Sequence, residues 1–158
     1  MGAFSGASLD FRSIYGTMIV RMNGQGFEEI EHTADVALHV WGEELAALFA
    51  NAARGMAYLL VGSQPVLEST VERRVELEAY DVETLLVSWL EELLYLAEEE
   101  HLIFTTFDFD EIDAHHLQAT ARGGSIDRIR LGIKAVTFSQ MAVQRGENGL
   151  ETDVVFDV

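Results

Sequence analysis

The chain has 158 residues, 49% of them apolar, and we expect one compact domain with a sizeable core and no second domain. Its formal charge of −17 opposes the binding of a polyanion such as RNA. It has no cysteine, which excludes disulfides, thiolate metal sites and a cysteine nucleophile, so any metal site must use oxygen or imidazole ligands.

Residues 1–26 are rich in glycine and serine and show no sustained apolar period. We therefore expect a flexible N-terminal extension over residues 1–26 and a folded domain over residues 27–158. The extension lacks the features of a signal peptide, and no later segment reaches the roughly 18 uninterrupted apolar residues of a membrane span. These features predict a cytoplasmic protein without membrane contact.

Two short strands followed by a helix are predicted over residues 27–62. The strands flank residues 31–35, and the second alternates through Val36, Leu38 and Val40, which places Asp35 and His39 on the opposite face. The helix has apolar residues at three-and-four spacing and is ended by Gly62. This apolar stripe comprises Leu45, Leu48, Phe49, Ala52, Met56, Leu59 and Leu60.

A half-exposed strand and a second helix are predicted next. Apolar and charged residues alternate over residues 74–79, and Asp81 can then cap a helix. That helix has an apolar face too wide for a surface helix, so we expect it to lie buried against a sheet. It ends in three glutamates, residues 98–100, which oppose the helix dipole and are most often a solubility feature.

The remainder of the chain is predicted to consist of strands. Gly123-Gly124 separates two of them, and residues 146–149 form a hairpin turn. In the last strand Thr152, Val154 and Phe156 point to one face and Asp157 to the other. The order of elements favours an α+β fold, a two-layer sandwich of a mixed or mostly antiparallel sheet packed with two main α-helices.

Two short segments could carry chemistry. Glu31-His32-Thr33-Ala34-Asp35 sets carboxylates, an imidazole and a hydroxyl close together, although turn hydrogen bonding is the commoner use of such residues. Asp157 precedes Val158, and the terminal carboxylate would stand beside the Asp157 side chain. This pair suits a hard divalent cation, but it is also compatible with a strand that ends in a solvated aspartate.

The two segments predict one site only if the first and last strands are neighbours. Asp35, Asp157 and the carboxylate of Val158 would then converge on one ion, with His32 or a backbone carbonyl completing the shell. Basic residues give a weaker signal. Arg128, Arg130 and Lys134 fall in one expected strand, where a solvated face is the ordinary explanation, so direct RNA binding is disfavoured or weak.

Three segments, in the right order, resemble the archease family. They are Phe27-Glu28-Glu29-Ile30-Glu31-His32-Thr33-Ala34-Asp35-Val36, Ile133-Lys134-Ala135-Val136-Thr137 and Val154-Val155-Phe156-Asp157-Val158. The resemblance implies the archease fold and a divalent metal, commonly calcium, bound by Asp35, Asp157 and Val158. It makes Lys134 a candidate for activating a partner, with His32 and Glu31 as orienting groups.

The resemblance also implies a function. Archeases assist an RtcB-type RNA ligase in tRNA splicing by promoting its guanylylation and repeated turnover, so the chain is expected to be a non-catalytic accessory protein. The alternatives are a metal-dependent hydrolase or nuclease with His32 as base, and a chaperone-like module that binds RNA-modifying enzymes. The chain departs from the family at Phe138-Ser139-Gln140, where an aromatic residue is often followed by His and Gly.

Overall fold

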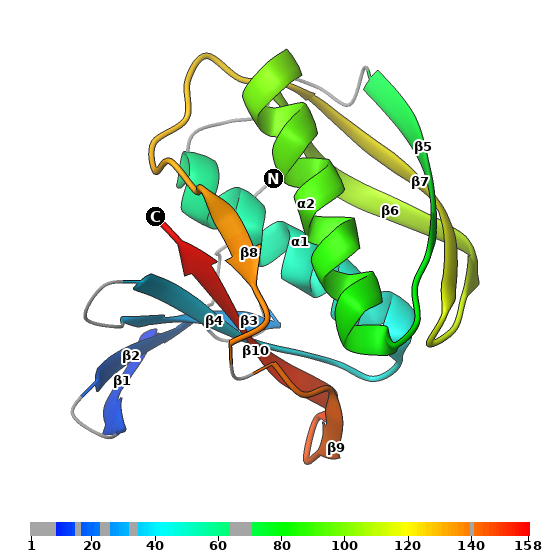
Figure 1. Ribbon diagram of the computed structural model, residues 1–158. Helices are drawn as coiled ribbons and strands as arrows, with labels where there is room; N and C mark the ends of the chain where they lie inside the picture. The colour runs from blue at the N-terminus through cyan, green and yellow to red at the C-terminus, as the bar shows by residue number, and fades with distance from the viewer. Residues whose placement is uncertain (1–8, 15–16, 23–25, 32–34, 64–70, 140) are drawn as a thin grey trace.

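Two antiparallel sheets pack against two helices in the computed structural model (Figure 1). It describes residues 9–14, 17–22, 26–31, 35–63, 71–139 and 141–158. The larger sheet has the order β1-β2-β3-β4-β10-β8, with β9 paired to β10, and the smaller has the order β5-β7-β6. The predicted α+β class is confirmed, with the strands divided between two sheets.

The strands of the larger sheet are β1 (Leu9–Ile14), β2 (Thr17–Met22), β3 (Phe27–Glu31), β4 (Asp35–Gly42), β8 (Ala135–Thr137), β9 (Gln144–Gly146) and β10 (Gly149–Asp157). Those of the smaller sheet are β5 (Val71–Glu78), β6 (Leu102–Ile112) and β7 (His116–Ser125). Strands β1 and β2 therefore form within the segment predicted as an extension. The domain boundary at Phe27 stays a prediction.

The helices are α1 (Leu45–Val61) and α2 (Val82–Glu100), as the apolar stripes predict. The first contacts β3, β4 and β10 of the larger sheet and β6 of the smaller, while α2 contacts β5, β6, β7 and β8. Gly62 ends α1 with a φ of 65°, and the Asp81 carboxylate caps α2 by accepting a hydrogen bond from the Thr84 amide at 2.8 Å.

The core lies between the sheets, on and around the two helices. Trp89 of α2 is fully buried there, and its indole N–H donates to the Phe49 carbonyl of α1 at 3.0 Å. This bond joins the helices and satisfies the one polar group of the ring. No helix in the described ranges is long and apolar enough to cross a membrane.

Two predictions about the later part of the chain are wrong. Gly123-Gly124 does not separate strands but lies inside β7. Position 123 needs glycine there because a Cβ atom would lie 1.9 Å from the Ile103 carbonyl oxygen of β6. Arg128, Arg130 and Lys134 do not share a strand but lie in the irregular segment between β7 and β8. The Arg130 and Leu131 amides there donate to the Leu60 carbonyl at the end of α1.

Candidate functional site

Asp35 and Asp157 face one another at the edge of the larger sheet where β4 begins and β10 ends. Strands β4 and β10 are antiparallel neighbours, and their register pairs Asp35 with Asp157 directly. Residues in such a pair point to the same face of the sheet, with Cβ atoms roughly 4.5–5.5 Å apart. Strand β4, which begins at Asp35, is therefore a neighbour of β10, the last strand of the chain. The predicted shared site depends on this adjacency.

The alternation of both strands decides which face the two aspartates occupy. Leu38 and Val40 of β4, and Val154 and Phe156 of β10, are buried in the core beneath the helices. Asp35 and Asp157 occupy the opposite parity, so their carboxylates lie on the face turned away from the core. Asp35 is half-buried and Asp157 is exposed.

Strand β8 brings Lys134 and Ala135 to the other side of Asp157. Ala135 pairs with Asp157, and the Lys134 amide donates to the Asp157 carbonyl at 2.7 Å. The Lys134 residue is exposed, whereas Val158 is half-buried and packs against the core. Four predicted site residues therefore lie together where β4, β8 and β10 meet.

The two possible orienting residues are placed differently. Glu31 is the last residue of β3, and its backbone pairs with Val36 of β4. His32 lies outside the described residues. Of the predicted site residues, the structure therefore brings together Asp35, Asp157 and Val158, with the Lys134 backbone bonded to Asp157.

The donor chemistry of this site fits a hard divalent cation. Two carboxylates placed directly opposite each other repel, and a cation between them relieves that repulsion. The carboxylate of a chain ending at Val158 would add a third oxygen ligand of the kind that calcium accepts. In the described ranges no three His, Cys, Asp or Glu side chains gather as a metal cluster.

Comparison with known proteins identifies the family. The sequence profile of the archease protein family matches residues 27–158, which is most of the chain. This chain belongs to the archease family. The archease of Methanosarcina mazei is 35% identical over 143 residues, covering 85% of this chain and 97% of the relative. That of Methanothermobacter thermautotrophicus is 33% identical, covering 85% and 99%.

Two solved structures share the archease fold. The solution structure of protein 1598 of Methanobacterium thermoautotrophicum superposes with a TM-score of 0.68 at 32% identity, covering 85% of this chain and 99% of that one. The crystal structure of an archease from Thermotoga maritima, described as a possible chaperone, gives a TM-score of 0.56 at 24% identity over 82% and 94%. The second supports the fold alone.

A histidine that the sequence gave little reason to single out lies on the same face of this archease sheet. The His39 Nδ1 atom is 2.7 Å from an Asp153 carboxylate oxygen, and its Nε2 atom is 3.7 Å from a Glu151 oxygen. The hydrogen bond to Asp153 raises the pKa of His39, with smaller contributions from the charges of Glu151 and Glu28, against the opposing effect of burial. The His39–Asp153 pair links β4 to β10. His39 lies four residues after Asp35, and Asp153 lies four residues before Asp157.

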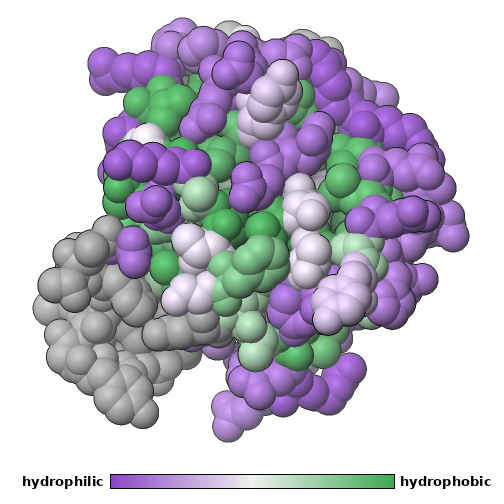
Figure 2. Space-filling model, in the orientation of Figure 1, coloured by the Kyte–Doolittle hydropathy of each residue, from purple (hydrophilic) through white to green (hydrophobic). Residues whose placement is uncertain are grey.

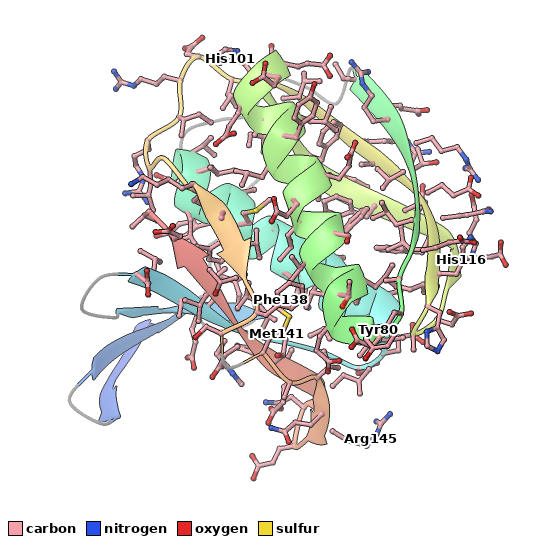
Figure 3. All side chains as sticks on the ribbon, viewed as in Figure 1. Tyr80, His101, His116, Phe138, Met141 and Arg145 are labelled. Carbon is pink, nitrogen blue, oxygen red and sulfur yellow. The ribbon has the colours of Figure 1, made fainter. Side chains whose placement is uncertain are left out.

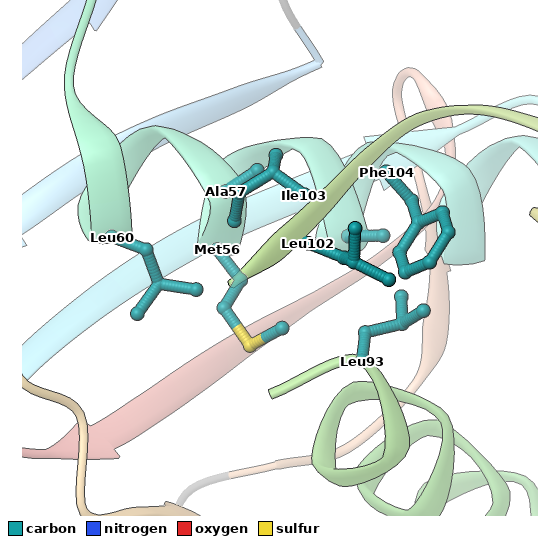
Figure 4. A pocket seen from close by; sticks show the side chains of 8 residues that line it. Met56, Ala57, Leu60, Leu93, Leu102, Ile103 and Phe104 are labelled. Carbon is teal, nitrogen blue, oxygen red and sulfur yellow. The ribbon is translucent and has the colours of Figure 1, made fainter. Parts of the chain in front are cut away.

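The enclosed space of the core does not suit a ligand. An apolar cavity lies between α1, α2 and β6, with Met56, Leu60, Leu93 and Ile103 among its lining (Figure 4). Its volume is about 10 Å³. A volume near 10–15 Å³ holds at most one water, which would need polar partners. This cavity is a packing gap, and the candidate chemistry remains at the β4–β10 edge.

Proposed function

We propose that this chain is an accessory protein that activates an RtcB-type RNA ligase in tRNA splicing, by promoting guanylylation of the ligase and its multiple turnover. In this proposal Asp35, Asp157 and Val158 hold a divalent cation, calcium by preference, and Lys134 contributes to activation of the partner. The chain itself performs no ligation. The possible-chaperone description of the Thermotoga maritima relative is compatible with such an accessory role.

The single observation that supports the site best is the direct pairing of Asp35 with Asp157 across two strands remote in sequence. Like charges placed directly opposite each other repel, and a bound cation would relieve that repulsion. The backbone hydrogen bond from the Lys134 amide to the Asp157 carbonyl supports a role for this residue next to the pair.

In this proposal the residues of the chain offer a bound cation and a lysine to the partner and catalyse no reaction themselves. The paired strands fix the two carboxylates, and a bound cation would neutralise them and give the edge a defined surface for a partner. The exposed Lys134 can then contact an anionic group of the ligase or its nucleotide. An accessory protein of this kind needs no phosphate-cradling loop of its own.

The test is multiple-turnover ligation by the RtcB-type ligase of the same organism, with the substrate RNA in excess. Asp35→Asn and Asp157→Asn should each abolish stimulation, while circular dichroism and the thermal midpoint show a retained fold, since neither residue belongs to the buried core. Glu147→Gln, in the exposed turn between β9 and β10, is the matched control and should stimulate as the unmodified chain does.

Four outcomes distinguish the alternatives. Full stimulation by both aspartate variants would remove the site assignment, and no stimulation by the unmodified chain would remove the accessory function. Hydrolysis of RNA by the isolated chain would favour a nuclease instead. Binding of the ligase without any change in its guanylylation rate would favour a chaperone-like module.

A further inference from the structure

The outward side of α2 is bordered by every large apolar side chain that is exposed in the described part of the chain. Tyr80 is 85% exposed, Tyr95 59% and Phe138 54%. Tyr80 precedes the Asp81 cap, Tyr95 lies on α2 itself, and Phe138 follows β8, which contacts α2. Exposed aromatic side chains that gather on one face mark interaction sites more often than isolated ones do.

One hydrogen bond ties the segment after β8 to α2, and another closes a turn within that segment. The Val143 amide donates to the Glu83 carboxylate in the first turn of α2 at 2.9 Å, and the Met141 amide donates to the Phe138 carbonyl at 3.1 Å. Figure 3 shows Phe138, Met141 and Tyr80 at the same end of α2. In Figure 1 no other helix or strand covers the outward side of α2, and in Figure 2 apolar atoms reach the surface of this face between polar side chains.

The charged residues of α2 are all acidic. The helix has six glutamates and no basic residue, and five of the six are exposed, namely Glu91, Glu92, Glu98, Glu99 and Glu100. Glu100 pairs with Arg73 of β5 at 3.0 Å, whereas the other four exposed glutamates have no cationic partner among the described residues. The last three oppose the helix dipole, so stabilisation of α2 does not account for them.

We propose that this α2 face, defined as Tyr80, Tyr95, Phe138, Met141 and the exposed glutamates of α2, is the surface by which the chain docks onto a basic protein partner. The inference rests on the proposed function, because a ligase that holds RNA must carry a basic surface. Aromatic anchors supply most of the binding energy in protein interfaces, and complementary charge sets the encounter rate and the orientation.

The position of β8 connects this face with the Asp35–Asp157 edge. Strand β8 contacts α2 on one side and pairs with β10 on the other. One partner can therefore cover the α2 face and reach around β8 to the two aspartates. The two surfaces have separate roles, since the α2 face would determine affinity and the aspartate edge would determine activation.

The experiment measures the dissociation constant between the full chain and the RtcB-type ligase of the same organism by biolayer interferometry. The double variant Tyr80→Ser/Phe138→Ser and the double variant Glu91→Lys/Glu98→Lys should each raise Kd by about tenfold or more. Glu111→Lys, an exposed glutamate of β6, is the matched control and should leave Kd within about twofold. Thermal midpoints near that of the unmodified chain establish that the variants fold.

A second readout separates docking from activation. At saturating concentration the α2-face variants should regain full stimulation of the ligase, whereas Asp35→Asn should bind with unchanged Kd and fail to stimulate. Raising the salt concentration should weaken binding of the unmodified chain more steeply than binding of Glu91→Lys/Glu98→Lys, because fewer complementary charges remain in the variant.

Each contrary result has a distinct meaning. Unchanged Kd in both double variants would overturn the α2 face and leave the proposed function standing. No binding of the ligase by the unmodified chain would overturn the proposed function and the docking surface together. Sedimentation showing a dimer that Tyr80→Ser/Phe138→Ser dissociates would also overturn the proposal, because a second copy would then occupy the face.

Discussion

At the scale of single residues, the contact between His39 and Asp153 links stability to pH. Its 2.7 Å hydrogen bond raises the pKa of the half-buried His39 above its ordinary value of 6.5. A histidine whose pKa is raised by folding stabilises the folded state while it is protonated. That contribution is complete below about pH 6.5 and is lost as the pH rises through the raised pKa of the folded state.

The prediction is that His39→Gln flattens the dependence of unfolding free energy on pH above about 6.5, as measured by urea unfolding at a series of pH values. Asp153→Asn should flatten the same region, because it removes the hydrogen-bond partner that contributes most to the shift. The double variant should add little to either single change. Parallel profiles for the unmodified chain and both variants would show that the pair does not couple pH to stability.

At the scale of elements, Gly123 determines how closely β6 and β7 approach. It pairs with Val71 of β5 and with Phe104 of β6, and a Cβ atom at this position would lie 1.9 Å from the Ile103 carbonyl oxygen. Backbone atoms cannot yield to such a contact without moving the strand. The ladder register already shifts between Phe104 and Thr106, next to this approach.

Gly123→Ala should therefore destabilise the fold by about 1–3 kcal/mol, the usual cost of forcing an extra group into a packed interior. The control is Gly132→Ala in the segment between β7 and β8, where a Cβ atom would meet nothing within 4 Å. Chemical denaturation of both variants compares the two positions directly. Equal stability of the two would show that the strands separate at little cost.

Helices and strands are predicted well from the sequence where their residue pattern has a local cause. The apolar stripe of α1, the Asp81 cap of α2 and the alternation of β10 all have local causes, and all three are found in the structure. The position of Gly123-Gly124 has a non-local cause, the close approach of β6, so a pattern typical of a turn lies inside a strand. Propensity is overridden there by tertiary contact.

For the whole molecule, the sequence supplied the candidate residues but not their adjacency. Asp35 and Asp157 are separated by most of the chain, and only the order of strands in the sheet makes them neighbours. The link between His39 and Asp153 depends on the same register and therefore had no signal in the local sequence. The exposed face of α2 was likewise hidden, because the composition of a helix does not tell which other segments cover it.

Titration calorimetry of the metal-free chain with calcium chloride measures whether the β4–β10 edge binds a divalent cation. We predict that one calcium ion binds per chain and that Asp35→Asn and Asp157→Asn each weaken this binding by at least about tenfold, since each removes one of few anionic ligands. Glu147→Gln should bind as the unmodified chain does. No heat of binding in the unmodified chain would contradict cation binding at this edge. So would aspartate variants that both bind calcium as tightly as the unmodified chain does.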